Sequence, residues 1–287
     1  MRKLISLSVL LALLAWASVC PAGAQAAPKI TESYGPGPAE FTLATGSPGE
    51  LGLLKVLGEA FGKKEQARLG WVKAGSGESL DLLKEKSVDM IMVHAPAQEK
   101  AALAEGWGTN HALIGSNEFY IVGPKKDPAQ IAKATSAADA YARIAGAEAR
   151  FFSRGDNSGT HKKELSIWKT AGITPAGGWY IIAKGFMKDA LMRADAEQGY
   201  FMTDSSTWVA VKKDLKGLVI LFRGDRVLIN TYHTLCQPEG ATPGAAIAAR
   251  FIGFVGSPAG QKIIGDFGKA EHGASLYNDA AYAKQYE

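Results

Sequence analysis

Short apolar runs alternate with longer amphipathic stretches along the first half of this chain. Each apolar run is typical of a buried strand, and each amphipathic stretch has the spacing of a helix with one apolar face. The pattern predicts strands at 41–45, 69–74, 88–93 and 116–124 and helices at 50–62, 80–86 and 98–105. Apolar strands that alternate with helices predict an α/β protein whose mainly parallel sheet is covered on both faces.

The second half of the chain continues the same alternation. The pattern predicts strands at 150–153, 199–202, 219–222 and 227–232 and helices at 137–145, 158–171, 187–197, 207–214, 245–254 and 257–267. There is no internal repeat, no heptad pattern and no linker rich in Pro, Gly or Ser. If the chain forms two lobes, it must therefore pass between them more than once.

The first 26 residues have the pattern of a cleaved secretory signal peptide. Arg2 and Lys3 precede an apolar run over 4–19, and the small-residue motif 24–26 follows it. Cys20 is assigned to the discarded peptide, because Val19 stands where a lipoprotein signal needs a small residue. We therefore expect the protein in the periplasm.

Composition narrows the classes of function that suit the remaining chain. Without Arg2 and Lys3, the 32 basic residues become 30 against 28 acidic ones, so the protein is nearly neutral. This balance argues against nucleic acid or a membrane surface as the partner and suits a local site for a small anion. Cys236 remains without a partner, so no internal disulfide is expected, and stability must come from burial of a core.

The segment FFSRGDNSGTHKKE (151–164) carries the clearest candidate chemistry. It predicts a strand end, a polar turn and the first turn of a helix, where backbone N–H groups have no partner within the helix. The charge of Arg154 and the positive end of the helix dipole would then converge on one point. This combination predicts an anion receptor, although Ser158 and Thr160 also suit an ordinary helix cap.

Four predicted junctions between a strand and a helix share this polar composition. In a parallel sheet such junctions lie at the carboxyl ends of the strands, which is where ligands bind in open α/β folds. Each junction alone is explained by helix capping, and capping is the favoured interpretation for the last of them. The four are Thr45–Ser47, Gly75–Gly77, Ser153–Thr160 and Thr203–Thr207.

Three segments in this order resemble the substrate-binding components of tungstate ABC transporters: LATGSPGELGLL (43–54), the strand ending in VHAP (93–96), and SRGDNSGTHKKE (153–164). The resemblance covers essentially the whole chain after the signal peptide. It implies a type II periplasmic binding protein, in which two α/β lobes close on an oxyanion around two hinge strands. It further implies a first lobe at 27–117, a second at 118–228 and a return to the first at 229–287, with hinge strands at 118–122 and 227–232.

The resemblance also implies the ligand-binding residues. Arg154 would clamp the oxyanion, and Ser158, Gly159 and Thr160 would supply donors from the second lobe. Thr45 and Ser47 would supply donors from the first lobe, with Ser76 as a further candidate. A lone histidine such as His94 is more often a packing residue than a ligand contact.

The implied function is capture of tungstate or molybdate by a monomer that delivers it to an inner-membrane permease. No catalysis, cofactor or metal is expected. The chain departs from the family at Thr45–Gly49, usually a run of threonines, and at Thr203–Trp208, where a second arginine is missing. The ligand could therefore be another anion, such as sulfate, phosphate or an organic acid, and a secreted hydrolase using Ser158 or Ser76 is a further alternative.

One metal-like pattern is set aside. His233 and Cys236 have residue types that bind zinc, but two ligands within one strand do not make a zinc site. A buried cysteine beside a polar histidine is the favoured interpretation.

Overall fold

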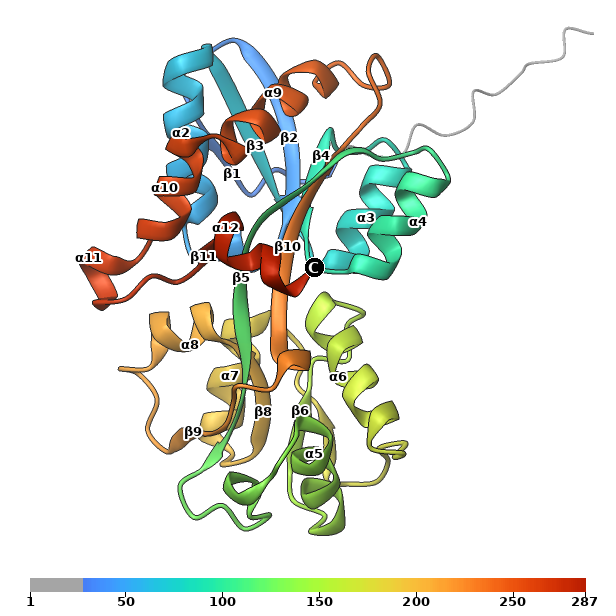
Figure 1. Ribbon diagram of the computed structural model, residues 1–287, viewed down its shortest axis with the longest axis vertical. Coiled ribbons are helices and arrows are strands. Elements are labelled where there is room, and N and C mark those ends of the chain that lie inside the picture. Colours follow the sequence, from blue (N-terminus) through green and yellow to red (C-terminus); the bar gives the residue numbers. More distant parts are fainter. Residues whose placement is uncertain (1–27) are drawn as a thin grey trace, which may run out of the picture.

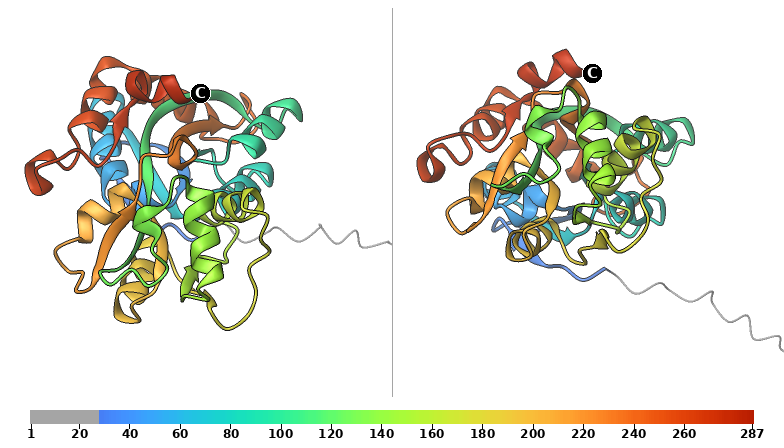
Figure 2. Two further views of the ribbon diagram at one scale, coloured as in Figure 1. Left: turned by 60° about the horizontal axis from the view of Figure 1, so that its bottom comes forward. Right: turned by 90° about the horizontal axis from the view of Figure 1, so that it is seen from below.

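The computed structural model describes residues 28–287, so the predicted signal peptide lies outside the described residues. Figure 1 shows an elongated molecule in which two lobes lie end to end and are joined by the long strands β5 (Thr109–Pro124) and β10 (Ile229–Cys236). Figure 2 shows the molecule turned by 60° and, on the right, seen from below, where the two lobes overlap along the line of view.

The first lobe has a sheet of four short strands in the order β1-β3-β2-β4. Strand β2 runs parallel to both of its neighbours, β3 and β4, whereas β1 is antiparallel to β3. The strands are β1 (Glu32–Tyr34), β2 (Ala39–Thr45), β3 (Ala67–Lys73) and β4 (Met90–Val93), and β11 (Asn278–Asp279) pairs with β5. The helices are α1 (Ser47–Glu50), α2 (Leu53–Glu65), α3 (Ser76–Lys84), α4 (Pro96–Ala104), α9 (Ala245–Gly256), α10 (Pro258–Asp266), α11 (Lys269–His272) and α12 (Ala280–Ala283).

Alternate side chains of these strands enter two separate cores, as the two-residue period of a strand requires. Leu43 and Met92 pack in one core with apolar residues of α2 and α9. Their neighbours Ala44 and Val93 pack in the other core with residues of α3 and α4. The sheet is thus covered by helices on both faces, which explains why its strands are continuous apolar runs.

The second lobe repeats this arrangement with its own core. Strand β6 lies between β7 and β8 and is parallel to both. Its core is centred on aromatic residues such as Phe151 and Trp168, and all its fully buried members fall between Phe119 and Leu228. The elements are β6 (Phe151–Ser153), β7 (Tyr180–Ile182), β8 (Tyr200–Asp204), β9 (Leu218–Phe222), α5 (Ala137–Gly146), α6 (Gly159–Thr170), α7 (Met187–Ala196) and α8 (Ser205–Val211).

The chain crosses between the lobes twice, through β5 and β10. These strands are antiparallel to each other, and they connect the two sheets because β10 also pairs with β4 and β5 also pairs with β8. The pairing changes register between Tyr232 and His233 and again between Thr234 and Cys236. The repeated crossing agrees with the absence of a linker in the sequence.

Several predicted boundaries were wrong, and the strand predicted at 116–124 begins already at Thr109. The helix predicted at 50–62 begins at Ser47 as the short α1 and restarts as α2 at Leu53, because Gly52 has a left-handed conformation with φ of 89°. The helix predicted at 80–86 begins at Ser76, directly after Gly75. The strand predicted at 227–232 begins at Ile229, because residues 226–228 form a 3₁₀ turn capped by Asp225. Pattern reading also missed β1, β7 and further 3₁₀ turns at 131–133 and 284–286.

Candidate functional site

A small polar cavity lies where the two lobes face each other. Its volume is about 20 Å³, which is room for a small ion rather than for a large organic ligand. Six of the seven predicted ligand-binding residues line it: Thr45, Ser47 and Ser76 from the first lobe and Arg154, Ser158 and Thr160 from the second. The remaining lining residues are Gly46, Pro48, Glu50, Gly75, Met92, His94, Phe186 and Tyr232.

The fold brings these residues together because each follows the carboxyl end of a strand. Thr45 ends β2, and Ser76 is the first residue of α3 after β3. Ser158 caps α6 after β6, with its hydroxyl oxygen accepting from the backbone N–H of His161 at 3.3 Å. The backbone N–H groups of Gly159 and Thr160 therefore open the helix and have no partner within it. Their partial positive charge faces the same region as Arg154.

Arg154 is nearly fully buried beside the cavity. One guanidinium nitrogen, Nη2, lies 2.5 Å from Oδ2 of Asp156, while its Nε is buried and forms no hydrogen bond to the described residues. Burial by itself would raise the pKa of Asp156, but Arg154 and hydrogen bonds from Ser158 lower it overall. Asp156 is therefore ionised and orients the arginine, which keeps an unused donor for a ligand.

The hydroxyl groups differ in what they can donate. Thr45 donates its hydroxyl hydrogen to the carbonyl of Met92 at 2.7 Å, so that hydrogen points away from a ligand. Ser76 accepts from the backbone N–H of His94 at 3.3 Å, which leaves its own O–H free to donate. Ser158 is in the same position, because its oxygen accepts from His161. The serines on opposite lobes are thus the better hydroxyl donors.

Gly159 faces a histidine and does not line the cavity. A Cβ on Gly159 would lie 2.3 Å from Cε1 and 2.5 Å from Nδ1 of His94, so the imidazole occupies the space that any side chain would need. The same imidazole lines the cavity and packs on the ring of Tyr232 at 4.9 Å. Burial lowers the pKa of His94 to about 4, against an opposing effect of Glu99, so the ring is neutral at neutral pH.

The fourth polar junction, Thr203–Thr207, has a structural role. Helix capping is also the interpretation that the sequence favoured for it. Asp204 caps α8 by accepting from the N–H of Thr207 at 2.8 Å and from its hydroxyl at 2.9 Å. Ser206 accepts from Asn117 of β5 and donates to the carbonyl of Leu276 at 2.6 Å. These buried contacts tie α8 to the crossing strand and to the returning chain, and none of these residues lines the cavity.

Sequence reasoning did not predict several cavity residues, among them Glu50, Phe186 and Tyr232. Glu50 is paired with Lys73 at 2.6 Å, so its charge is balanced, and Nζ of Lys73 also lies 4.1 Å from the ring centre of Phe186. The guanidinium carbon of Arg154 lies 5.8 Å from the same ring. Glu50 directly follows the polar turn and is the first residue of the helix that the sequence predicted at 50–62. Phe186 and Tyr232 had no signal, because only the fold brings them to this point.

The fold defines a type II periplasmic binding protein: two α/β lobes connected by crossing strands, with a cavity between them. Residues 24–259 match a PBP superfamily domain. The chain is 35% identical over 241 residues to the tungstate-binding protein TupA of Peptoclostridium acidaminophilum, a match that covers 83% of this chain and 84% of that protein.

Two solved structures are also similar. The tungstate ABC transporter structure from Geobacter sulfurreducens has a TM-score of 0.71 and 38% identity, covering 80% of this chain and 100% of that one. Tungstate-binding protein TupA from Desulfovibrio alaskensis has a TM-score of 0.68 and 35% identity, covering 84% of this chain and 98% of that one. The chain belongs to the family of substrate-binding proteins of tungstate ABC transporters. Within residues 28–287, no helix combines the length and the apolar character needed to cross a membrane.

Proposed function

We propose that this protein captures a tetrahedral oxyanion, tungstate or molybdate, between its lobes and delivers it as a monomer to the permease of an ABC importer. The observation that carries the proposal is the buried Arg154, whose Nε has no partner among the described residues, beside a cavity lined by polar groups of both lobes. A buried guanidinium with an unused donor needs an anion more than any other ligand.

The charge of the cavity favours a small anion that is held mainly by hydrogen bonds. Asp156 cancels part of the charge of Arg154, and Lys73 balances Glu50. The remaining stabilisation comes from the first N–H groups of α6 and the free hydroxyls of Ser76 and Ser158, which are fixed donors at set distances. Such donors replace the hydration shell of an oxyanion and select it by size.

Binding from both lobes provides the free energy for closure. A ligand shifts a two-state protein only by its difference in affinity for the two states. Donors from Ser76 on the first lobe and from Arg154 and Ser158 on the second can contact one anion only when the lobes are together. We propose lobe boundaries at 27–117, 118–228 and 229–287, supported by the separate cores on either side of β5 and β10. Export to the periplasm, by cleavage after residue 26, is part of the same proposal.

A non-enzymatic role is supported by how the serines are bonded. The hydroxyl oxygen of Ser158 accepts from the backbone of His161, while the imidazole Nδ1 of His161 accepts from the N–H of Asn157 at 3.0 Å. Ser76 accepts from the backbone of His94. Neither serine is hydrogen-bonded to an imidazole, as an activated nucleophile would be.

The test is a thermal-shift titration with tungstate, molybdate, sulfate, phosphate and vanadate. Stabilisation rises with ligand concentration relative to Kd, so the ranking of the anions follows directly. Tungstate or molybdate should raise the Tm at the lowest concentration. If sulfate or phosphate raised the Tm at the lowest concentration, that anion would be the ligand of the site. If none of the five anions raised the Tm, the oxyanion assignment would be overturned. Turnover of an ester or phosphate substrate would instead support the hydrolase alternative.

A further inference from the structure

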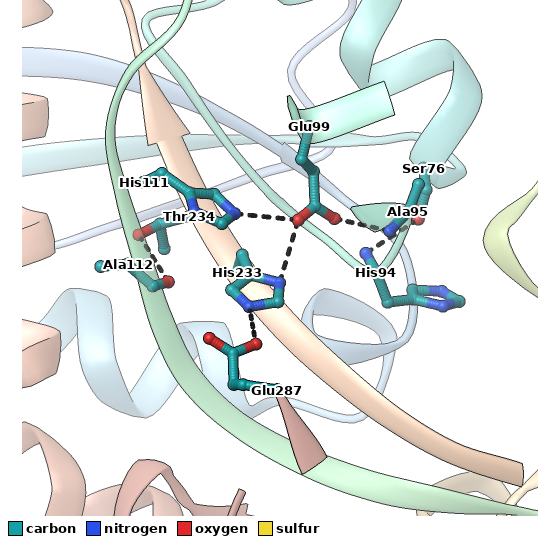
Figure 3. Close-up of polar contacts among 9 residues, drawn as sticks. All are labelled: Ser76, His94, Ala95, Glu99, His111, Ala112, His233, Thr234 and Glu287. Atoms are coloured by element: carbon teal, nitrogen blue, oxygen red, sulfur yellow. Dashed lines mark hydrogen bonds and ion pairs between the residues drawn. The ribbon is translucent and has the colours of Figure 1, made fainter. Parts of the chain in front are cut away.

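A second cluster of polar side chains lies in the first lobe, away from the anion cavity. It consists of Glu99 on α4, His111 on β5 and His233 on β10, whose ligand-type atoms all lie within 4.8 Å of one another. Figure 3 shows both imidazoles in contact with one oxygen of Glu99, and the two rings are stacked with their centres 4.5 Å apart. The side chains of Glu99 and His233 are 0% and 2% exposed and that of His111 is 25% exposed, so the cluster is reached from one side.

The carboxylate of Glu99 is held in place by the backbone. Its Oε1 accepts from the N–H of Ala95 at 2.6 Å, at the start of α4. Its Oε2 is therefore turned toward the histidines and lies 3.0 Å from Nε2 of His111 and 2.9 Å from Nδ1 of His233. One oxygen atom faces two imidazole nitrogens from two different strands (Figure 3).

His233 is oriented from its other side. Its Nε2 lies 2.8 Å from Oε1 of Glu287, so a neutral ring that donates its Nε2 proton to this carboxylate would have a lone pair on Nδ1. That Nδ1 is buried and, although it lies near Glu99, it forms no hydrogen bond of acceptable geometry. A lone pair on Nδ1 that faces a carboxylate oxygen is unfavourable unless a second ring proton or a metal ion lies between them. A carboxylate that orients a histidine from behind is also the usual support of a metal-binding imidazole.

The geometry points to a site for a divalent transition-metal ion, with Zn²⁺ as the best match, bound by Glu99, His111 and His233 and supported by Glu287. Two imidazoles and one carboxylate are a ligand set that suits zinc and its neighbours in the first transition row. Bonds of 2.0–2.2 Å in a tetrahedral site place ligand atoms about 3.3 Å apart. The observed 2.9 and 3.0 Å need only a small outward movement to reach that spacing.

This site is separate from the cavity that carries the proposed function. It joins α4 to both crossing strands, so a bound ion would connect three elements of the first lobe and stabilise them. The fourth coordination position of the bound ion would face the exposed side of His111 and hold a water molecule. Cys236, which the sequence paired with His233, is not one of the converging groups, and its Sγ instead accepts from Nδ2 of Asn110 at 3.2 Å.

The experiment uses tag-free protein treated with a chelator and then titrated with Zn²⁺, and in parallel with Co²⁺ as an optical probe. We expect one equivalent to bind, the Tm to rise, and Co²⁺ to give the visible absorption of a four-coordinate site. Mg²⁺ and Ca²⁺, which prefer sets of oxygen ligands, should give no effect.

Three variants separate this site from adventitious binding. His111→Ala removes the most exposed ligand and should abolish the Co²⁺ spectrum in a folded protein. Glu287→Gln alters only the support of His233 and should weaken the affinity about 10–100-fold. The matched control is His272→Ala, which removes a histidine of α11 outside the cluster and should change nothing. Zn²⁺ binding that is absent, or that is equally strong in His111→Ala and the parent, would overturn the proposal.

Discussion

The imidazole of His94 on the first lobe occupies the space next to the Cα of Gly159 on the second lobe, so that a Cβ at position 159 would lie 2.3 Å from the ring. Two further glycines of the first lobe also lie close against the second lobe. A Cβ on Gly77 would lie 2.7 Å from the carbonyl oxygen of Asn157, and one on Gly75 would lie 3.3 Å from Cβ of Ser158. At these three points, glycine backbone of one lobe lies directly against the surface of the other lobe. A side chain at any of the three positions would keep the lobes from coming this close.

Gly159→Ala should weaken anion binding by preventing full closure. Forcing an added methyl group into packed surroundings costs about 1–3 kcal/mol, which corresponds to roughly a 5–150-fold loss of affinity. Replacing His94 by Ala in the same chain should recover part of the loss, because the clash is with that ring. Isothermal titration calorimetry on the two single variants and the double variant gives the coupling.

Gly146→Ala is the matched control, because nothing lies within 4 Å of a Cβ at that position near the end of α5. It should bind the anion as the parent does. If the double variant bound no better than Gly159→Ala alone, the contact between the lobes would not be the cause.

Arg154→Ala should reduce anion affinity by at least about 2 kcal/mol, or roughly 30-fold, in calorimetric titrations. The variant removes the buried guanidinium and also leaves the Asp156 carboxylate beside the cavity, where it repels an anion. Arg154→Lys keeps the charge but loses the planar set of donors, so its affinity should lie between those of the parent and of Arg154→Ala. Arg143→Ala, which breaks a surface pair with Asp139 on α5, should leave the affinity unchanged. If Arg154→Ala bound the anion as tightly as the parent, Arg154 would not hold the ligand, and the proposed site would be wrong at its central residue.

His94 should make anion binding stronger at acidic pH. Burial lowers its pKa to about 4, with the positive charges of Lys163 and Arg154 acting in the same direction and Glu99 and Asn230 opposing them. A bound anion would raise this pKa, so binding takes up a proton as the pH falls toward that value, and the affinity rises there. Between about pH 6.5 and 8 the ring is neutral and contributes no pH dependence.

The measurement for His94 is the ratio of the affinities of the parent and of His94→Gln, because titration of the anion itself cancels in this ratio. The ratio should be constant from about pH 6.5 to 8 and should grow in favour of the parent toward about pH 5. A ratio that stays constant over the whole range would mean that His94 does not sense the bound charge.

Glu164→Gln should stabilise the protein more at alkaline than at acidic pH. Burial raises the pKa of Glu164 to about 7, although hydrogen bonds from Tyr180, Ser153 and Trp168 lower it in part. The folded state therefore holds this proton more tightly than the unfolded state does. The stability that the proton supplies is present below the unfolded pKa, near 4.5, and is lost as the pH rises through about 7.

Relative to the parent, Glu164→Gln should gain on the order of 3 kcal/mol of unfolding free energy between about pH 4.5 and 8. Urea denaturation at several pH values measures this difference. Glu239→Gln, at an exposed position, is the control and should track the parent. A Glu164→Gln variant that lost stability equally at every pH would show that the amide disrupts the hydrogen bonds to Tyr180 and Trp168.

The sequence by itself determined most of the elements, the family and six of the residues that line the cavity. Strand and helix periods are local, so the apolar runs and polar turns were visible without tertiary contacts. Arg154, Ser158 and Thr160 lie in one continuous segment, and the residues from the first lobe followed from the resemblance. Helix starts such as Ser47 and Ser76 were misplaced, because helix entry depends on a turn geometry that one residue of glycine or proline can shift.

Only the tertiary structure decided which distant residues meet. Phe186 and Tyr232 reach the cavity, and His94 meets Gly159, because the crossing strands bring the lobes together. Glu99, His111 and His233 converge for the same reason, from three elements that are far apart in the chain. A sequence pattern records the environment along one element, whereas contacts between elements depend on sheet order and strand register, which no single segment contains.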